Sequence, residues 1–122
     1  MSNGLFVSEV DGTTHVSFCD SSILDGPYVD KIANELYALI DKQARKRILL
    51  DFSQVKFLSS TMIGVLLALH EKANRISGKV IVYGLHGSLH DVLKITRMDK
   101  LLNLAESEEE AMSAFGNGAA TR

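Results

Sequence analysis

Three consecutive hydroxyl side chains, Ser59, Ser60 and Thr61, are the group in this sequence best placed to do chemistry. They follow an apolar run at 48–52 and precede a segment with helical periodicity, so they fall where the connection from a buried strand enters a helix. Hydroxyl oxygens there cap the free N–H groups of the first turn, which is their commonest role. A phosphate added there would be held by the positive end of the helix and would bring about two negative charges. The position therefore suits both a cap and a phosphorylation switch.

The other reactive side chains form no catalytic or metal-binding group. His86 and His90 have the i, i+4 spacing of metal ligands, but Gly87 and Ser88 between them favour a turn, and no third ligand is near in sequence. The segment 84–87 lacks the lysine and hydroxyl residue of a P-loop. No nucleophile can be matched with a base and an orienting acid. We therefore predict a protein that is not an enzyme and that uses no metal and no cofactor.

The first half of the chain predicts a hairpin, a helix and a buried strand. Asp11-Gly12 is a tight-turn sequence, so 5–10 and 13–19 are expected to pair as strands. A helix is expected from Tyr28 to Lys46, started by Pro27. Four basic residues, Lys42, Arg45, Lys46 and Arg47, are expected to complement the dipole at its end. The apolar run 48–52 is typical of a strand covered on both faces.

The second half predicts further alternation of helices and strands. Helices are expected at 60–76 and 88–96, with strands at 79–83 and 101–104. Ser107 precedes Glu110 by three residues, which is the spacing of a capping box at the start of a last helix that packs through Ala111, Met112 and Phe115. Residues 116–122 have nothing to bury, so we expect a disordered tail.

These elements predict an α/β protein with a mixed β-sheet of four to five strands and about four α-helices. Strands joined through a helix must be parallel and connected by right-handed crossovers. At 122 residues the chain has room for one core, so we predict a single domain over 1–115.

Composition and charge exclude several classes of function. The chain is 46% hydrophobic and 23% charged with a formal net charge of -2, and no basic stripe predicts nucleic-acid or membrane binding. The longest apolar stretch, 65–69, is far shorter than the roughly 20 residues of a membrane helix. The amino terminus lacks the features of a secretory signal, and the single cysteine, Cys19, suits a reducing compartment. We expect a cytoplasmic protein.

The segment DFSQVKFLSSTMIGVLLALHEKA, residues 51–73, resembles the signature of the STAS family of regulatory domains. That signature is an apolar strand ending in Asp-Leu/Phe-Ser, followed by an aromatic residue, a hydroxyl pair and a Leu-Gly-Val-Leu helix. The segment VIVYGLHGSLHDVLKITRMDKLL resembles the last strand of the family and the helix after it. Ile23-Leu24-Asp25 resembles the loop that precedes the first helix.

The resemblance implies a protein that binds partners rather than substrates. In bacterial anti-sigma factor antagonists, a kinase-type anti-sigma factor phosphorylates the second residue of the hydroxyl pair, and the unphosphorylated form binds that kinase. The corresponding residue is Thr61, with Ser60 as the alternative acceptor. Ser59 and Met62 stand where the family usually has Asp and Gly, so we expect Met62 to lie beside the acceptor. The implied partner-binding residues are Asp25, Ser59, Ser60, Thr61 and Met62.

We therefore predict an anti-sigma factor antagonist that binds a serine/threonine-kinase anti-sigma factor, or a related kinase, and is switched by phosphorylation. The alternative is a STAS scaffold or interaction subunit in which the hydroxyl pair only caps a helix. A third class, a small phosphoryl-transfer or hydrolytic enzyme, lacks a catalytic constellation. The sequence leaves a homodimer open.

Overall fold

A computed structural model describes residues 5–18, 22–23, 27–85, 87–95, 97 and 102–120. The predicted partner-binding residue Asp25 lies outside these residues, as do Cys19 and His86. The strands are β1 (Leu5–Val10), β2 (Thr13–Phe18), β3 (Ser22–Ile23), β4 (Arg47–Asp51), β5 (Phe57–Leu58), β6 (Lys79–Tyr83) and β7 (Asn103–Ala105). The helices are α1 (Pro27–Asp41), α2 (Ser60–Arg75), α3 (Gly87–Ile95) and α4 (Glu108–Ala120).

The main sheet has five strands in the order β1-β2-β4-β6-β7. β1 pairs antiparallel with β2, and the three other pairs are parallel, as their helical crossovers require. The predicted α/β class with a mixed sheet is confirmed. A second, two-stranded parallel sheet between β3 and β5 is not predicted from the sequence, because two-residue strands leave no periodic pattern.

The predicted hairpin turn is confirmed in its residues and its backbone. Asp11 has φ 53° and Gly12 has φ 79°, which are the positive angles that a two-residue turn requires. The turn fixes the β2 register so that Val16 and Phe18 face the core, where both are fully buried.

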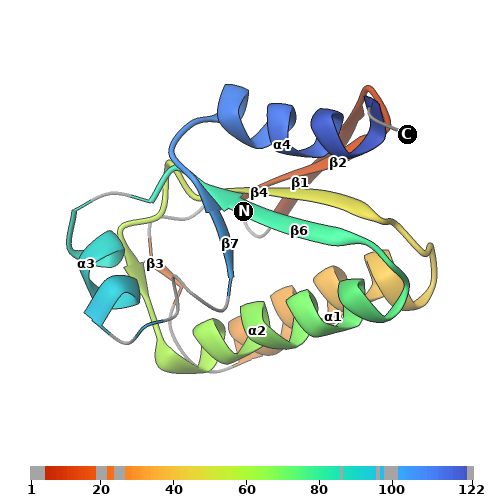
Figure 1. Cartoon of the computed structure of the whole chain (residues 1–122). Helices are drawn as coiled ribbons and strands as arrows, with labels where there is room; N and C mark the ends of the chain where they lie inside the picture. The colour runs from red at the N-terminus through yellow and green to blue at the C-terminus, as the bar shows by residue number, and fades with distance from the viewer. Residues whose placement is uncertain are drawn as a thin grey trace.

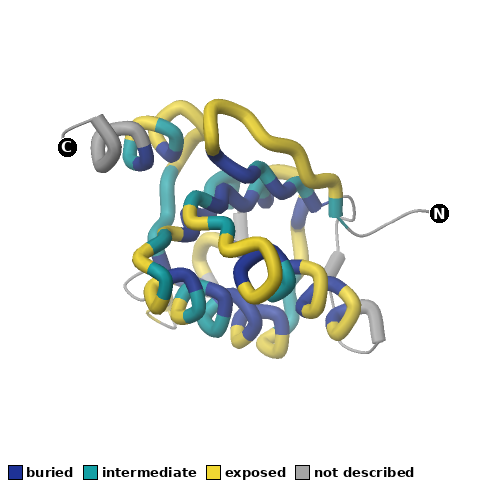
Figure 2. Tube along the Cα trace, turned by 90° about the vertical axis from the view of Figure 1, so that its right-hand side faces the viewer, coloured by how far each residue is buried: buried dark blue, intermediate teal, exposed yellow. Residues whose placement is uncertain are grey.

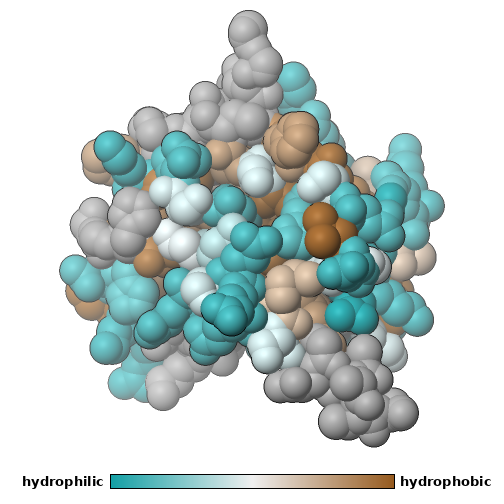
Figure 3. All heavy atoms as spheres, turned by 90° about the horizontal axis from the view of Figure 1, so that it is seen from above, coloured by the Kyte–Doolittle hydropathy of each residue, from teal (hydrophilic) through white to brown (hydrophobic). Residues whose placement is uncertain are grey.

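Helices cover the two faces of the sheet unequally (Figure 1). α1 and α2 lie side by side on one face, and α4 lies on the other. Buried residues therefore concentrate between the sheet and the α1–α2 layer, and exposed residues follow the outer sides of the helices (Figure 2). The side that carries α4 is largely hydrophilic, with separate apolar patches (Figure 3).

The larger core cluster joins the sheet to α1 and α2, and its central residues are the alternate positions Ile48 and Leu50 of β4. The position between them, Leu49, points to the opposite face and packs with Ile81, Ala111 and Phe115 beneath α4. β4 is thus buried on both faces, as its continuous apolar run predicts. Arg47 extends over the Phe115 ring, 5.6 Å from its centroid, and helps to hold α4 on the sheet.

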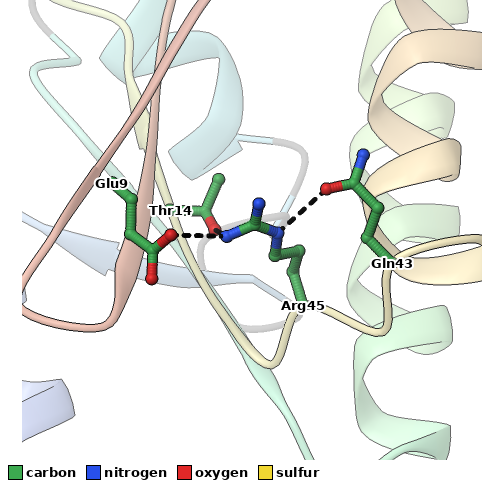
Figure 4. A network of polar contacts seen from close by, with 4 residues as sticks. All are labelled: Glu9, Thr14, Gln43 and Arg45. Atoms are coloured by element: carbon green, nitrogen blue, oxygen red, sulfur yellow. Dashed lines mark hydrogen bonds and ion pairs between the residues drawn. The ribbon is translucent and has the colours of Figure 1, made fainter.

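The first helix ends earlier than the sequence predicts. α1 stops at Asp41, and Ala44 has φ 51°, a left-handed conformation that cannot continue a helix. The expectation that basic residues complement the dipole of its last turn is therefore wrong, since that turn carries none. Arg45 instead crosses to the hairpin, where its Nη1 atom donates to Glu9 Oε1 at 3.0 Å and to Thr14 Oγ1 at 3.3 Å (Figure 4).

The Ser107 cap of the last helix is confirmed, because the Glu110 N–H donates to Ser107 Oγ at 3.1 Å. The Glu110 carboxylate accepts from the Glu106 N–H at 2.8 Å, one residue before the donor that a standard capping box uses. The helix is longer than predicted, because α4 continues past Phe115 to Ala120, into the segment that the sequence assigns to a tail. Among the described residues, no helix is long and apolar enough to cross a bilayer.

Candidate functional site

The candidate site begins where β4 leaves the sheet. The Asp51 carboxylate accepts a hydrogen bond from the Ser53 N–H at 2.8 Å and another from the side chain of Tyr83, its register partner on β6. Burial, together with the charge and hydrogen bond of Asp51, raises the pKa of Tyr83 above its usual range. Asp51 therefore ties the first residues of the β4–α2 connection to the neighbouring strand.

A glycine allows this connection to lie against the end of β6. Gly84 has φ 88°, and a Cβ atom added to it would lie 2.7 Å from the Ser53 nitrogen. Only glycine fits at that distance and with that backbone angle. The first residue of the connection, Phe52, donates its N–H to the Tyr83 carbonyl at 2.9 Å and buries its ring against Phe18, with centroids 4.6 Å apart.

The middle of the connection forms β5, and it exposes an aromatic side chain. Ser22 and Ile23 of β3 pair in parallel with Phe57 and Leu58 of β5. This pairing brings the backbone that precedes α1 beside the backbone that precedes α2. Phe57 lies two residues before Ser59, and its side chain is 58% exposed. Phe57 is therefore a surface residue and not part of the core.

Phe57 is not among the site residues predicted from the sequence. The available signal was a large aromatic residue within a segment assigned to a connection, two residues before Ser59. Tyr83 and Gly84 were also missed as supports, because their role depends on a pairing between β4 and β6 that sequence spacing does not show.

Ser59 caps α2, as the sequence predicts. Its backbone is extended (φ -79°, ψ 161°), and its Oγ atom accepts a hydrogen bond from the Met62 N–H at 3.1 Å. Ser60 and Thr61 are the first two residues of the helix, and both side chains are exposed. The N–H groups of the first helical residues have no partner within a helix. The two hydroxyls therefore stand on the surface beside unpaired backbone donors.

The structure corrects the expectation that Met62 is a partner-binding residue on the surface beside the acceptor. Its side chain is 0% exposed and belongs to the core between α2 and the sheet, so it supports the surface from below and makes no surface contact. At the third position of the helix the side chain points inward, while Ser60 and Thr61 point outward. Met62 therefore does not obstruct the Thr61 hydroxyl.

The electrostatic setting of α2 differs from that of α4. The first turn of α4 carries Glu108, Glu109 and Glu110, whereas the first turn of α2 carries no acidic residue. The positive end of α2 is consequently not neutralised by its own side chains. An anionic group on Thr61 would be stabilised there by the helix dipole and the backbone donors.

The remaining sequence candidates lie elsewhere or are not described. His90 is exposed on α3, and His86 lies outside the described residues, so their pairing is untested. In the part of the chain that the structure describes, no three His, Cys, Asp or Glu side chains gather in a way that could hold a metal ion.

A sheet of this order with helices on both faces, and a hydroxyl pair at the start of its second helix, define a regulatory domain of the STAS type. The family model for the STAS domain matches residues 21–111, and the chain belongs to this family. It is 24% identical over 111 residues to BtrV from Bordetella bronchiseptica, a protein whose name describes an anti-sigma factor antagonist. The match covers 91% of this chain and 93% of BtrV.

Solved structures share the fold. An anti-sigma factor antagonist from Mycobacterium paratuberculosis superposes with a TM-score of 0.80 at 24% identity, covering 93% of each chain. The Bacillus protein SpoIIAA in its phosphorylated form superposes with a TM-score of 0.69 at 18% identity, covering 92% of this chain and 99% of that chain.

Proposed function

We propose that this protein is an anti-sigma factor antagonist that binds a kinase-type anti-sigma factor in the cytoplasm and is released when Thr61 is phosphorylated. The observation that carries the proposal is the placement of Thr61, which is exposed at the start of α2 while its neighbours Ser59 and Met62 are fixed by a cap and by the core. Ser60 is the alternative acceptor.

The docking surface that we propose consists of Phe57, Ser60 and Thr61. Phe57 supplies an exposed apolar contact, and the two hydroxyls supply polar contacts without formal charge. Such a surface suits a partner that removes it from water. A phosphate on Thr61 would bring about two negative charges and a hydration shell into that contact. Binding would then require the partner to desolvate the phosphate, which disfavours the complex.

The relatives support this proposal. BtrV is named for anti-sigma antagonism, and SpoIIAA has been solved both unphosphorylated and phosphorylated. The predicted contact Asp25 enters the proposal only through its position in sequence, close to β3, which pairs with β5.

The acceptor can be tested by incubating the protein with its cognate kinase-type anti-sigma factor and ATP, and by mapping the phosphate with mass spectrometry. We expect one phosphate on Thr61, unchanged in Ser60→Ala and absent in Thr61→Val. Phosphate on Ser60 in the wild type would move the switch to the alternative acceptor. Absence of phosphate from both Ser60 and Thr61, with an active kinase, would refute the switch.

The alternative proposal is a STAS scaffold that is not phosphorylated. The Ser59 cap favours it, because capping alone already explains a hydroxyl residue at the start of α2. The intact mass of protein purified from its own cells separates the two proposals. A phosphorylated fraction supports the switch, whereas a constitutive complex of unmodified protein supports the scaffold.

A further inference from the structure

The strand β1 lies at an edge of the main sheet. Among the residues that the structure describes, it pairs with β2 alone, in a register that runs without a bulge from Leu5–Phe18 to Val10–Thr13. Natural proteins blunt such edges with lysine, proline, bulges or a covering segment. The sequence LFVSEV contains no lysine and no proline, and its side chains after Leu5 are all exposed.

The hairpin turn determines which backbone groups face the open edge. In a two-residue hairpin the closing pair, here Val10 and Thr13, exchanges both hydrogen bonds, and hydrogen-bonded pairs then alternate along the strands. Phe6, Ser8 and Val10 therefore direct their N–H and C=O groups toward β2. Val7 and Glu9 direct theirs outward, where they are available to another strand.

The apolar side chains of β1 are arranged for a particular partner. Phe6 and Val10 are 64% and 45% exposed. They lie on the same face as Ser8, whose register partner His15 approaches Glu108 of α4. Two apolar residues therefore flank a small serine on one face of an edge strand. Antiparallel pairing with an identical strand about Ser8 would place each Phe6 opposite a Val10.

The single charge on this edge does not oppose such pairing. Glu9 forms an ion pair with Arg45, whose Nη1 atom also reaches Thr14 (Figure 4). Two copies of Glu9 brought near a two-fold axis would therefore each carry a neutralising arginine. Like charges that face each other without such partners destabilise a strand pair.

We infer that the protein forms a homodimer through antiparallel pairing of β1 with β1 of a second copy. Ser8 lies opposite Ser8 of the second copy, and Val7 and Glu9 lie opposite Glu9 and Val7 in the hydrogen-bonded pairs. Phe6 and Val10 then meet in the non-hydrogen-bonded pairs, where side chains are closest. The two sheets become one continuous sheet, and its apolar edge is buried.

This pairing has a consequence for partner binding that rests on the proposed function. β1 runs antiparallel to β2 and β4, so a two-fold axis through Ser8 turns β4 of the second copy in the opposite direction. The Thr61 sites then lie at opposite ends of the continuous sheet. Both remain open, and the dimer binds two anti-sigma factor molecules at once.

The dimer is tested without any partner by sedimentation equilibrium over a series of protein concentrations. We expect a concentration-dependent doubling of the mass, lost in Phe6→Lys and retained in Ile95→Lys, which adds the same charge at an exposed apolar residue of α3. A monomer at every concentration would overturn the inference, as would a dimer that persists in Phe6→Lys. Circular dichroism checks that both variants are folded.

A cysteine pair tests the register. In a Cys19→Ser background, Ser8→Cys places two thiols across the axis at a Cα separation of about 4.5 Å, within the range that a disulfide spans. We expect Ser8→Cys to form a disulfide-linked dimer on mild oxidation, and Glu9→Cys to stay monomeric under the same conditions. Cross-linking of Glu9→Cys instead, or of neither variant, would contradict this register. Neither test depends on Thr61. A result that overturns the dimer therefore leaves the proposed phosphorylation switch standing.

Discussion

The Ser59 hydroxyl oxygen accepts a hydrogen bond from the Met62 N–H at 3.1 Å, and this contact determines how the start of α2 is presented. Ser59 is fixed by the cap, and Met62 is fixed by burial in the core. Ser60 and Thr61, between them, have a fixed backbone and exposed side chains. The backbone that carries the two exposed hydroxyl groups is therefore held on both sides.

Replacing Ser59 by alanine removes the cap. We expect Ser59→Ala to lower the free energy of unfolding by about 1 kcal/mol, because the Met62 N–H loses its acceptor. Ser59→Asp should restore the stability, since aspartate caps helices equally well and favours the positive end of the dipole. Urea unfolding of the three proteins measures the effect. Ser60→Ala, at an exposed position outside the cap, is the control, and an equal loss in that variant would contradict the assignment.

Gly84 and Gly64 provide a matched pair of glycine substitutions. Gly84→Ala should destabilise the protein by about 1–3 kcal/mol, because an alanine at φ 88° is strained and its Cβ would meet the Ser53 nitrogen. Gly64→Ala should stabilise it by up to about 1 kcal/mol, because that helical position has no atom within 4 Å of the new Cβ. Thermal unfolding distinguishes the two. Equal shifts would show that Gly84 does not hold the β4–α2 connection.

The raised pKa of Tyr83 predicts that the folded protein loses stability at alkaline pH. Its folded-state pKa is raised above the unfolded value of about 10, because burial and Asp51 disfavour the tyrosinate. The folded protein therefore holds the phenolic proton more tightly than the unfolded chain. The stabilisation is complete below the unfolded pKa and is lost as the pH rises toward the folded pKa.

The measurement is the free energy of unfolding as a function of pH for the wild type and Tyr83→Phe. At neutral pH we expect Tyr83→Phe to be less stable by about 1 kcal/mol, through loss of the hydrogen bond to Asp51. Above the unfolded pKa the two curves should converge, because only the wild type loses this contribution. Parallel curves up to the alkaline limit would contradict the role of Tyr83.

Much of the fold follows from local sequence signals. Asp11-Gly12 specified the hairpin, the run at 48–52 specified the buried strand, and Ser107 with Glu110 specified the last cap. Each of these depends on residues adjacent in sequence, so a single chain reveals it. The hydroxyl group at the start of α2 was found in the same way.

The features that sequence analysis missed depend on contacts between distant residues. The end of α1 is set by the left-handed backbone at Ala44 and by Arg45 crossing to Glu9, 36 positions away. β5 and its exposed Phe57 exist through pairing with β3. The burial of Met62 depends on how α2 packs on the sheet. Periodicity within one segment carries no information on such contacts.

The central claim is that negative charge on Thr61 weakens partner binding without disturbing the fold. Isothermal titration of the cognate kinase-type anti-sigma factor against wild type, Thr61→Glu and Thr61→Gln tests it most directly, since the two variants differ only in charge. We predict that Thr61→Glu weakens binding by roughly 30-fold or more relative to Thr61→Gln, the equivalent of about 2 kcal/mol. Equal affinities of Thr61→Glu and Thr61→Gln for that partner would contradict the account.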